Sequence, residues 1–142
     1  MKNIGRSIKL KNSIRHYVGP VSVTVTGFDD GWTLGNVMVN NKRFHYAIKN
    51  FPEKSQFGID RGCISKMGID RNGQTLVNYE RGWDVKPVDT DVKMAYKALL
   101  ELFNDTMPED CLPYWKKSVG VADTVRTARP KTKKKENLPF GL

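Results

Sequence analysis

The sequence contains few residues of the kinds that build disulfide frameworks and zinc sites. It has two cysteines, Cys63 and Cys111, and two histidines, His16 and His45. Small domains held together by disulfides need more cysteines than this, and a structural zinc site takes about four Cys or His ligands. The sequence therefore predicts no disulfide framework, no metal centre and no bound cofactor.

Long apolar runs are absent as well. No segment approaches the roughly 18–20 consecutive apolar residues that cross a bilayer, and residues 1–17 have no apolar stretch of the signal-peptide type. Apolar residues make up 39% of the chain and charged residues 27%, which is an ordinary composition for a soluble domain. The length of 142 residues fits one domain. We therefore expect a single cytoplasmic domain with no membrane partner.

Acidic residues are scarce at the two ends of the chain, where basic residues accumulate. Residues 1–17 contain five bases and no acid, residues 18–120 contain 13 of each, and residues 121–142 contain six bases and two acids. The net charge of +9 therefore comes from the ends. We expect a basic N-terminal arm over residues 1–17, a single α+β domain over 18–120 and a disordered basic tail over 121–142.

Basic flexible segments commonly hold polyanions, because each Lys or Arg placed on a phosphate releases condensed counterions. The alternative is that both ends are solvated tails that only aid solubility. The bases predicted to contact nucleic acid are Lys2, Arg6, Lys9, Lys11, Arg15, Arg126, Arg129, Lys131, Lys133, Lys134 and Lys135.

The central part of the chain has the pattern of β-strands. Valines at positions 21, 23 and 25 alternate with polar residues, which is typical of a strand with one buried face. The pairs Asp30-Gly31, Asn40-Asn41 and Asn72-Gly73 favour tight turns, because these residues tolerate positive φ. These signals predict strands near residues 21–26, 32–39, 43–49, 63–69 and 74–80.

One helix is expected after these strands, because Asp89 or Thr90 can cap its first turn. Apolar residues then recur at helical spacing and form a stripe that should cover the sheet: Val92, Ala95, Tyr96, Leu99, Leu100 and Phe103. The predicted fold class is α+β: an antiparallel meander of five to six short strands, covered by one main C-terminal helix, with flexible basic ends.

Two short strings stand out in the region rich in glycine, charge and aromatics. The first is Gly58-Ile59-Asp60-Arg61-Gly62-Cys63-Ile64-Ser65-Lys66, and the second is Tyr79-Glu80-Arg81-Gly82-Trp83-Asp84. Together, over about residues 32–104, they resemble a family of small, functionally uncharacterised proteins of phages and mobile elements. Its pattern is Gly-Ile-x-x-Gly-x-Ile-Ser-Lys followed by Tyr-x-Arg-Gly-Trp-Asp. The resemblance implies a genetic context, and hence the cytoplasm of a host cell, but no chemistry.

The string from Arg81 to Asp84 allows two interpretations. In the structural one, which we favour, Gly82 takes a backbone conformation closed to other residues, Trp83 is buried under the helix, and Arg81 pairs with Asp84 or Asp60. In the functional one, the string belongs to a recognition surface, because Trp, Tyr and Arg dominate binding hot spots and also stack on unpaired bases. The candidate recognition residues are Arg61, Lys66, Arg81 and Trp83.

Recognisable catalytic motifs are missing. The chain has no Gly-x-Ser-x-Gly elbow, Walker loop, paired-histidine helix or Cys-x-x-Cys. Nothing in the local sequence supports a Cys63–His45 pair. Asp60, Asp70 and Asp84 are able to gather a divalent ion of nuclease type, but each lies beside a glycine or in a predicted turn, where Asp commonly serves the backbone. We therefore expect no catalytic residue and no enzymatic activity.

These observations predict a non-enzymatic accessory protein of a phage or mobile element. Its expected target is nucleic acid or a nucleoprotein complex of the host, contacted through the basic ends. The alternative is an inhibitor that binds a host defence protein directly, in the manner of anti-CRISPR proteins. A metal-dependent nuclease that uses the three aspartates is a weaker alternative. The oligomeric state is left open.

Overall fold

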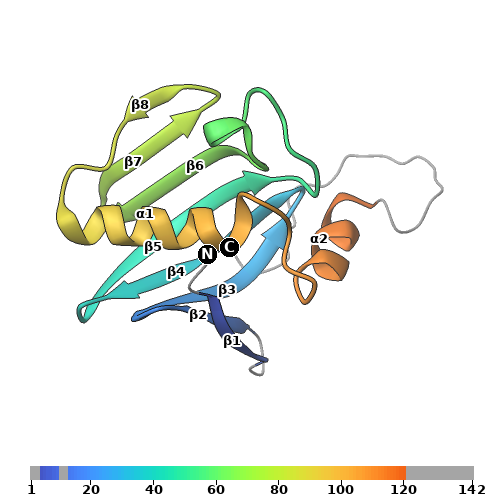
Figure 1. Ribbon diagram of the computed structural model, residues 1–142, viewed down its shortest axis with the longest axis horizontal. Helices are drawn as coiled ribbons and strands as arrows, with labels where there is room; N and C mark the ends of the chain where they lie inside the picture. Colours follow the sequence, from blue (N-terminus) through green and yellow to red (C-terminus); the bar gives the residue numbers. More distant parts are fainter. Residues whose placement is uncertain (1–3, 10–12, 121–142) are drawn as a thin grey trace.

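The computed structural model describes residues 4–9 and 13–120, and the side chains from residue 13 onward. Eight strands form one antiparallel sheet, in which each strand pairs with the next along the chain (Figure 1). The strands are β1 Ile4–Lys9, β2 Ile14–Val18, β3 Val21–Asp29, β4 Trp32–Val39, β5 Lys42–Asn50, β6 Ile64–Arg71, β7 Gln74–Glu80 and β8 Trp83–Val85. The 3-10 turn η1 (Ile59–Arg61) and the helices α1 (Thr90–Phe103) and α2 (Leu112–Val119) complete the described elements. The α+β class, the meander and the main helix are confirmed.

The turn chemistry of the sequence explains three of the hairpins. Positive φ at both central residues is the requirement of the tight turn whose twist matches that of antiparallel strands. The predicted turn pairs meet this requirement: Asp30 (φ 51°) and Gly31 (89°), Asn40 (50°) and Asn41 (67°), and Asn72 (56°) and Gly73 (79°).

The sheet has more strands than the five to six that were expected. Two of the additional strands are β1, which lies within residues 1–17, and β2, which lies there except for Val18; residues 1–17 were assigned to a flexible basic arm. That assignment needs correction for residues 4–9 and 14–17. Ile14, His16 and Val18 alternate along β2 and are each at most 5% exposed. Bases between such residues do not prevent a strand, because period-2 geometry turns them to the other face. The predicted tail, residues 121–142, lies outside the described residues.

α1 lies across one face of the sheet and forms the core with it (Figure 1). Its ring of Phe103 packs 6.3 Å from the ring of Tyr46 on β5. Its N-terminal turn is held by Asp91, which accepts from Asn40 Nδ2 and pairs with Lys42 Nζ, each at 2.8 Å. The buried face of α1 differs slightly from the predicted stripe, since Tyr96 and Leu100 are half-buried at its margins. The buried residues are Val92, Ala95, Ala98, Leu99, Leu102 and Phe103.

α2 packs on the same side, against β3 and the turn before β4. Trp115 Nε1 donates to the carbonyl of Gly31 at 3.1 Å, and Tyr114 stacks on Phe28 with ring centroids 6.1 Å apart. Cys111 is the N-cap of α2, and Pro113 lies in its first turn. Neither described helix is long and apolar enough to span a membrane.

The second face of the sheet carries the alternate residues of the same strands. Asn36 on β4 pairs in register with His45 on β5, which pairs with Asp70 on β6. These side chains are exposed or half-buried, whereas their neighbours Val37, Phe44 and Ile69 are at most 2% exposed. We call this second face the open face.

Candidate functional site

The loop before β6 and the turn after β7 meet at one corner of the domain, beside α1. Tyr79 links the two segments: its hydroxyl donates to the carbonyl of Phe57 at 3.1 Å, and its ring packs edge-on against Trp83 at 5.0 Å. The Arg81 guanidinium lies over the Phe57 ring at 5.6 Å. Trp83 also contacts the ring of Tyr96 at 5.6 Å. We call these five residues the arginine–aromatic corner.

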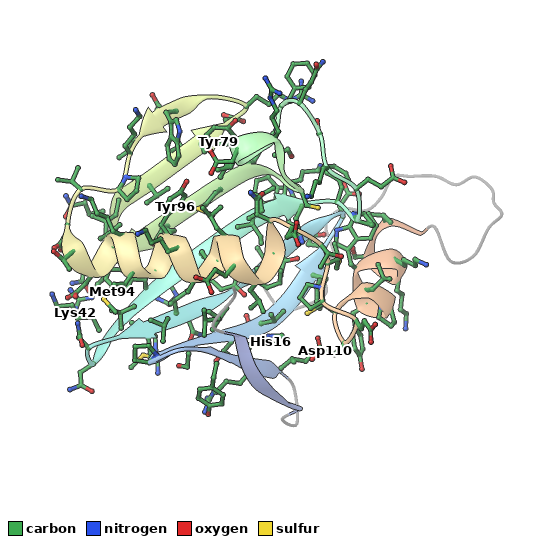
Figure 2. The ribbon with its side chains drawn as sticks, viewed as in Figure 1. His16, Lys42, Tyr79, Met94, Tyr96 and Asp110 are labelled. Atoms are coloured by element: carbon green, nitrogen blue, oxygen red, sulfur yellow. The ribbon has the colours of Figure 1, made fainter. Side chains whose placement is uncertain are left out.

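The corner presents apolar and cationic surface together. Phe57 is 52% exposed and Trp83 is 37% exposed, and Arg81 is exposed between them. Tyr79 is buried beneath, and Tyr96 reaches toward it from α1 (Figure 2). Burial, and then the negative charge of nearby Asp60, raise the pKa of Tyr96 to about 12. The Tyr96 hydroxyl therefore stays neutral near pH 7.

The first string of the sequence builds the loop that carries Phe57. A Cβ on Gly58 would lie 2.1 Å from the carbonyl oxygen of Gly62, and a Cβ on Gly62 would lie 2.3 Å from Asn104 Nδ2. Only glycine permits these approaches. Asn104, which ends α1, fastens the loop: its Nδ2 donates to Ile59 O at 2.8 Å and its Oδ1 accepts from Ile64 N at 2.9 Å.

The structural interpretation of the second string needs correction in three respects. Arg81 itself adopts positive φ (64°), whereas Gly82 is not among the positive-φ glycines. Trp83 is not buried under α1 but packs at its edge. Among the described residues, neither Asp84 nor Asp60 forms an ion pair with Arg81; Asp84 accepts a 3.4 Å hydrogen bond from Asn78 instead. The turn therefore bends at a residue that prefers a different backbone conformation.

The structure divides the four predicted recognition residues between two faces. Arg81 and Trp83 belong to the corner, and Arg61, with φ 59°, lies in the loop that also carries Phe57. Lys66 points to the open face, where its Nζ lies 3.4 Å from Glu80. It lines a shallow hollow of about 220 Å³ over Gly68 and beside Trp32. Lys66 is therefore not part of the corner.

The residues considered for catalysis do not assemble. Within residues 13–120, Asp60, Asp70 and Asp84 form no group that could share a metal ion. Cys63 is buried at the start of β6, whereas His45 is exposed on the open face. These described residues therefore form neither the nuclease centre of three aspartates nor the Cys63–His45 pair that were considered from the sequence.

The predicted phosphate-contacting bases are only partly described. Arg15 lies on β2, where its Nε donates to Thr24 Oγ1 at 3.2 Å, so its side chain is held against the sheet. Arg6 and Lys9 lie within β1. The others fall outside the described residues: Lys2, Lys11, Arg126, Arg129, Lys131, Lys133, Lys134 and Lys135.

Sequence reasoning missed two members of the corner and the residue that supports it. Phe57 directly precedes the first string, but nothing local indicated that its ring would meet Arg81. Tyr96 was assigned to the core stripe, because its helical spacing is the same as that of buried residues. Asn104 follows the predicted helix, and nothing in the neighbouring residues indicated the long-range hydrogen bonds by which it holds the loop.

The fold and the corner define a small α+β domain with an exposed arginine–aromatic surface. Residues 31–104 match a protein family described as a domain of unknown function, DUF7678. The match covers more than half of the chain, which therefore belongs to this family. It includes the whole corner and excludes both basic ends. The chain matches no curated protein and no solved structure.

Proposed function

We propose that this protein is a non-enzymatic accessory protein of a phage or mobile element that binds single-stranded nucleic acid, alone or within a nucleoprotein complex of the host. The arginine–aromatic corner stacks on unpaired bases, and the basic residues at both ends contact phosphates. The observation that carries the proposal is the exposed Trp83 beside Arg81 and Phe57.

Stacking and charge suit this target in different ways. Aromatic rings and guanidinium planes stack on any base, which contributes about 1–3 kcal/mol per base without sequence preference. The six bases and two acids of residues 121–142 add a nonspecific electrostatic attraction that weakens with salt. The corner therefore accounts for a preference for unpaired strands, and the tail for affinity.

The unusual backbone of the corner supports a role beyond folding. Positive φ is uncommon for a long side chain such as Arg, and it occurs here at Arg61 and Arg81. Such conformations cost of order 1–3 kcal/mol each and cluster at binding and catalytic sites. With this backbone conformation, the exposed Arg81 has its guanidinium over the Phe57 ring.

The test measures binding of fluorescent single-stranded DNA and RNA to the full chain by anisotropy. We expect Arg81→Asn combined with Trp83→Leu to weaken binding by about tenfold or more, because both stacking groups are removed. Asn tolerates positive φ, so the turn is kept. Arg43→Asn combined with Trp32→Leu, on the open face, is the matched control with the same change in charge.

The contribution of the tail is measured separately through the salt dependence. Replacing Lys131, Lys133, Lys134 and Lys135 with Gln should lower the slope of log K against log salt by up to roughly 3. Equal losses in the corner variant and its control would argue against the corner as the binding surface. A wild-type affinity that does not depend on salt would argue against phosphate contacts.

A direct inhibitor of a host defence protein is the second candidate. The same corner favours it, since exposed Trp, Tyr and Arg are the residues that dominate protein–protein hot spots. Affinity capture from infected cells, with and without nuclease treatment, separates the two candidates. A partner protein that survives nuclease and moderate salt, and is lost in the corner variant, would favour the inhibitor.

A further inference from the structure

Three side chains with metal-binding atoms meet where β2 faces the segment that leads into α2. His16 lies on β2, and Asp110 and Cys111 directly precede α2, so that His16 and Asp110 are separated by 94 positions. An imidazole nitrogen, a carboxylate oxygen and the Cys111 sulfur all lie within 4.8 Å of one another. Figure 2 shows His16 and Asp110 approaching each other from the sheet and from this segment.

The cluster is buried on one side and open on the other. His16 is 3% exposed and Cys111 is fully buried, whereas the side chain of Asp110 is 37% exposed. An ion can therefore reach the cluster from solvent past Asp110, while the imidazole and the sulfur are shielded. A single exposed carboxylate binds ions only weakly. This cluster differs from such a surface site because two of its three ligands are buried.

The hydrogen bonds of the cluster are incomplete. His16 Nε2 lies 3.1 Å from both carboxylate oxygens of Asp110, and the buried Nδ1 of the same ring has no hydrogen-bond partner among the described residues. A neutral imidazole needs a donor for its lone pair, and a charged one needs a second acceptor. Buried polar atoms are normally satisfied, so the His16–Asp110 contact accounts for Nε2 but leaves Nδ1 without a partner among the described residues.

We propose that His16, Asp110 and Cys111 bind a divalent transition-metal ion, with Zn²⁺ as the preferred ion. A nitrogen, an oxygen and a sulfur ligand suit Zn²⁺ and its neighbours, whereas Mg²⁺ and Ca²⁺ take oxygen ligands. Three protein ligands leave a fourth position for water on the exposed side of Asp110. On binding, the Cys111 thiol releases its proton to solvent and the sulfur bonds to the ion, with no change of oxidation state.

The site would fasten α2 to the sheet. Its ligands come from β2 and from the two residues before α2, both outside residues 31–104 that match the family. The bound ion therefore stabilises flanking elements of this chain, and the proposal does not rest on the function of the corner.

The test uses the full chain without a histidine tag, stripped of metal by a chelator and titrated with Co²⁺. We expect thiolate-to-cobalt absorption in the near ultraviolet that saturates at one ion per chain and disappears when Zn²⁺ is added. Cys111→Ser should abolish this absorption, whereas Cys63→Ser, at the other buried cysteine, should keep it. His16→Gln and His45→Gln form a second matched pair with the same expectation.

A conservative variant separates coordination from hydrogen bonding. In Asp110→Asn, the side-chain amide oxygen still accepts a hydrogen bond from His16, but the amide is a poor metal ligand. We expect Co²⁺ affinity to fall by at least about tenfold while the melting temperature of the metal-free protein changes little. The proposal would be overturned if the folded wild type showed no thiolate absorption with Co²⁺. It would also be overturned if folded Cys111→Ser or Asp110→Asn kept the wild-type absorption. In either case the three side chains would form a hydrogen-bond network only.

Discussion

The side chain of Asn104, at the end of α1, accepts a hydrogen bond from the backbone N–H of Ile64, the first residue of β6, at 2.9 Å. The same side chain donates to Ile59 O, and the Asn104 carbonyl accepts from Cys63 N at 2.8 Å. One residue thus joins the helix, the sheet and the loop that carries Phe57. The geometry of the arginine–aromatic corner depends on this junction.

Removing the junction should destabilise the whole domain. Asn104→Ala leaves Ile64 N–H and Ile59 O without partners in a largely buried setting, and each loss costs about 1–3 kcal/mol. We expect the free energy of unfolding in urea to fall by about 2–4 kcal/mol. Asn36→Ala on the open face is the control and should change stability by less than about 1 kcal/mol. Equal effects would show that the Asn104 bonds contribute little.

Two glycines of the domain should respond oppositely to alanine. Gly58→Ala places a Cβ 2.1 Å from Gly62 O, so the loop must shift and we expect a loss of about 1–3 kcal/mol. A Cβ at Gly68 meets nothing within 4 Å, so Gly68→Ala should be neutral or stabilising by about 0.5–1 kcal/mol. Thermal melts of both variants check this. A Gly58→Ala protein as stable as the wild type would contradict the close approach.

At most positions a protein with alanine is more stable than one with glycine, but the backbone of Arg81 predicts the reverse. At φ 64° the Cβ of alanine lies too close to the following carbonyl oxygen, whereas glycine has no Cβ. We expect Arg81→Gly to be more stable than Arg81→Ala by about 1 kcal/mol. At Glu80, in the regular strand β7, the order should be the normal one, with alanine more stable. The same order at both positions, measured by urea denaturation, would refute strain at Arg81.

Tyr96 should make the protein sensitive to alkaline pH. Its pKa lies above the ordinary value of 10.0, at about 12, because burial and Asp60 disfavour the tyrosinate. The folded state therefore favours the neutral phenol, and its stabilising effect is fully present below pH 10 and is lost as the pH rises through about 12.

Two variants test this dependence. Between pH 10 and pH 12, the free energy of unfolding of Tyr96→Phe should fall less than that of the wild type, because phenylalanine cannot ionise. Asp60→Asn should lower the pKa of Tyr96, seen as tyrosinate absorbance that develops at lower pH. Identical alkaline profiles for the wild type and Tyr96→Phe would contradict the shift.

Much of the fold could be predicted because its signals are local. The strand ranges 32–39 and 74–80 coincide with β4 and β7, since turn pairs such as Asn72-Gly73 fix where each hairpin reverses. The family match over residues 31–104 does not bear on the resemblance to phage and mobile-element proteins. The phage origin of the chain stays a prediction.

The sequence by itself determined the meander, because period-2 alternation and positive-φ turn residues act over a few neighbouring positions. Only the tertiary structure decided that β2 joins the sheet, that Lys66 and Arg81 point to different surfaces, and that His16 meets Asp110 across 94 positions. These outcomes depend on how the two helices pack on one face of the sheet. Contacts between residues far apart in the sequence, such as the His16–Asp110 hydrogen bond, set that packing, and they leave no pattern in neighbouring residues.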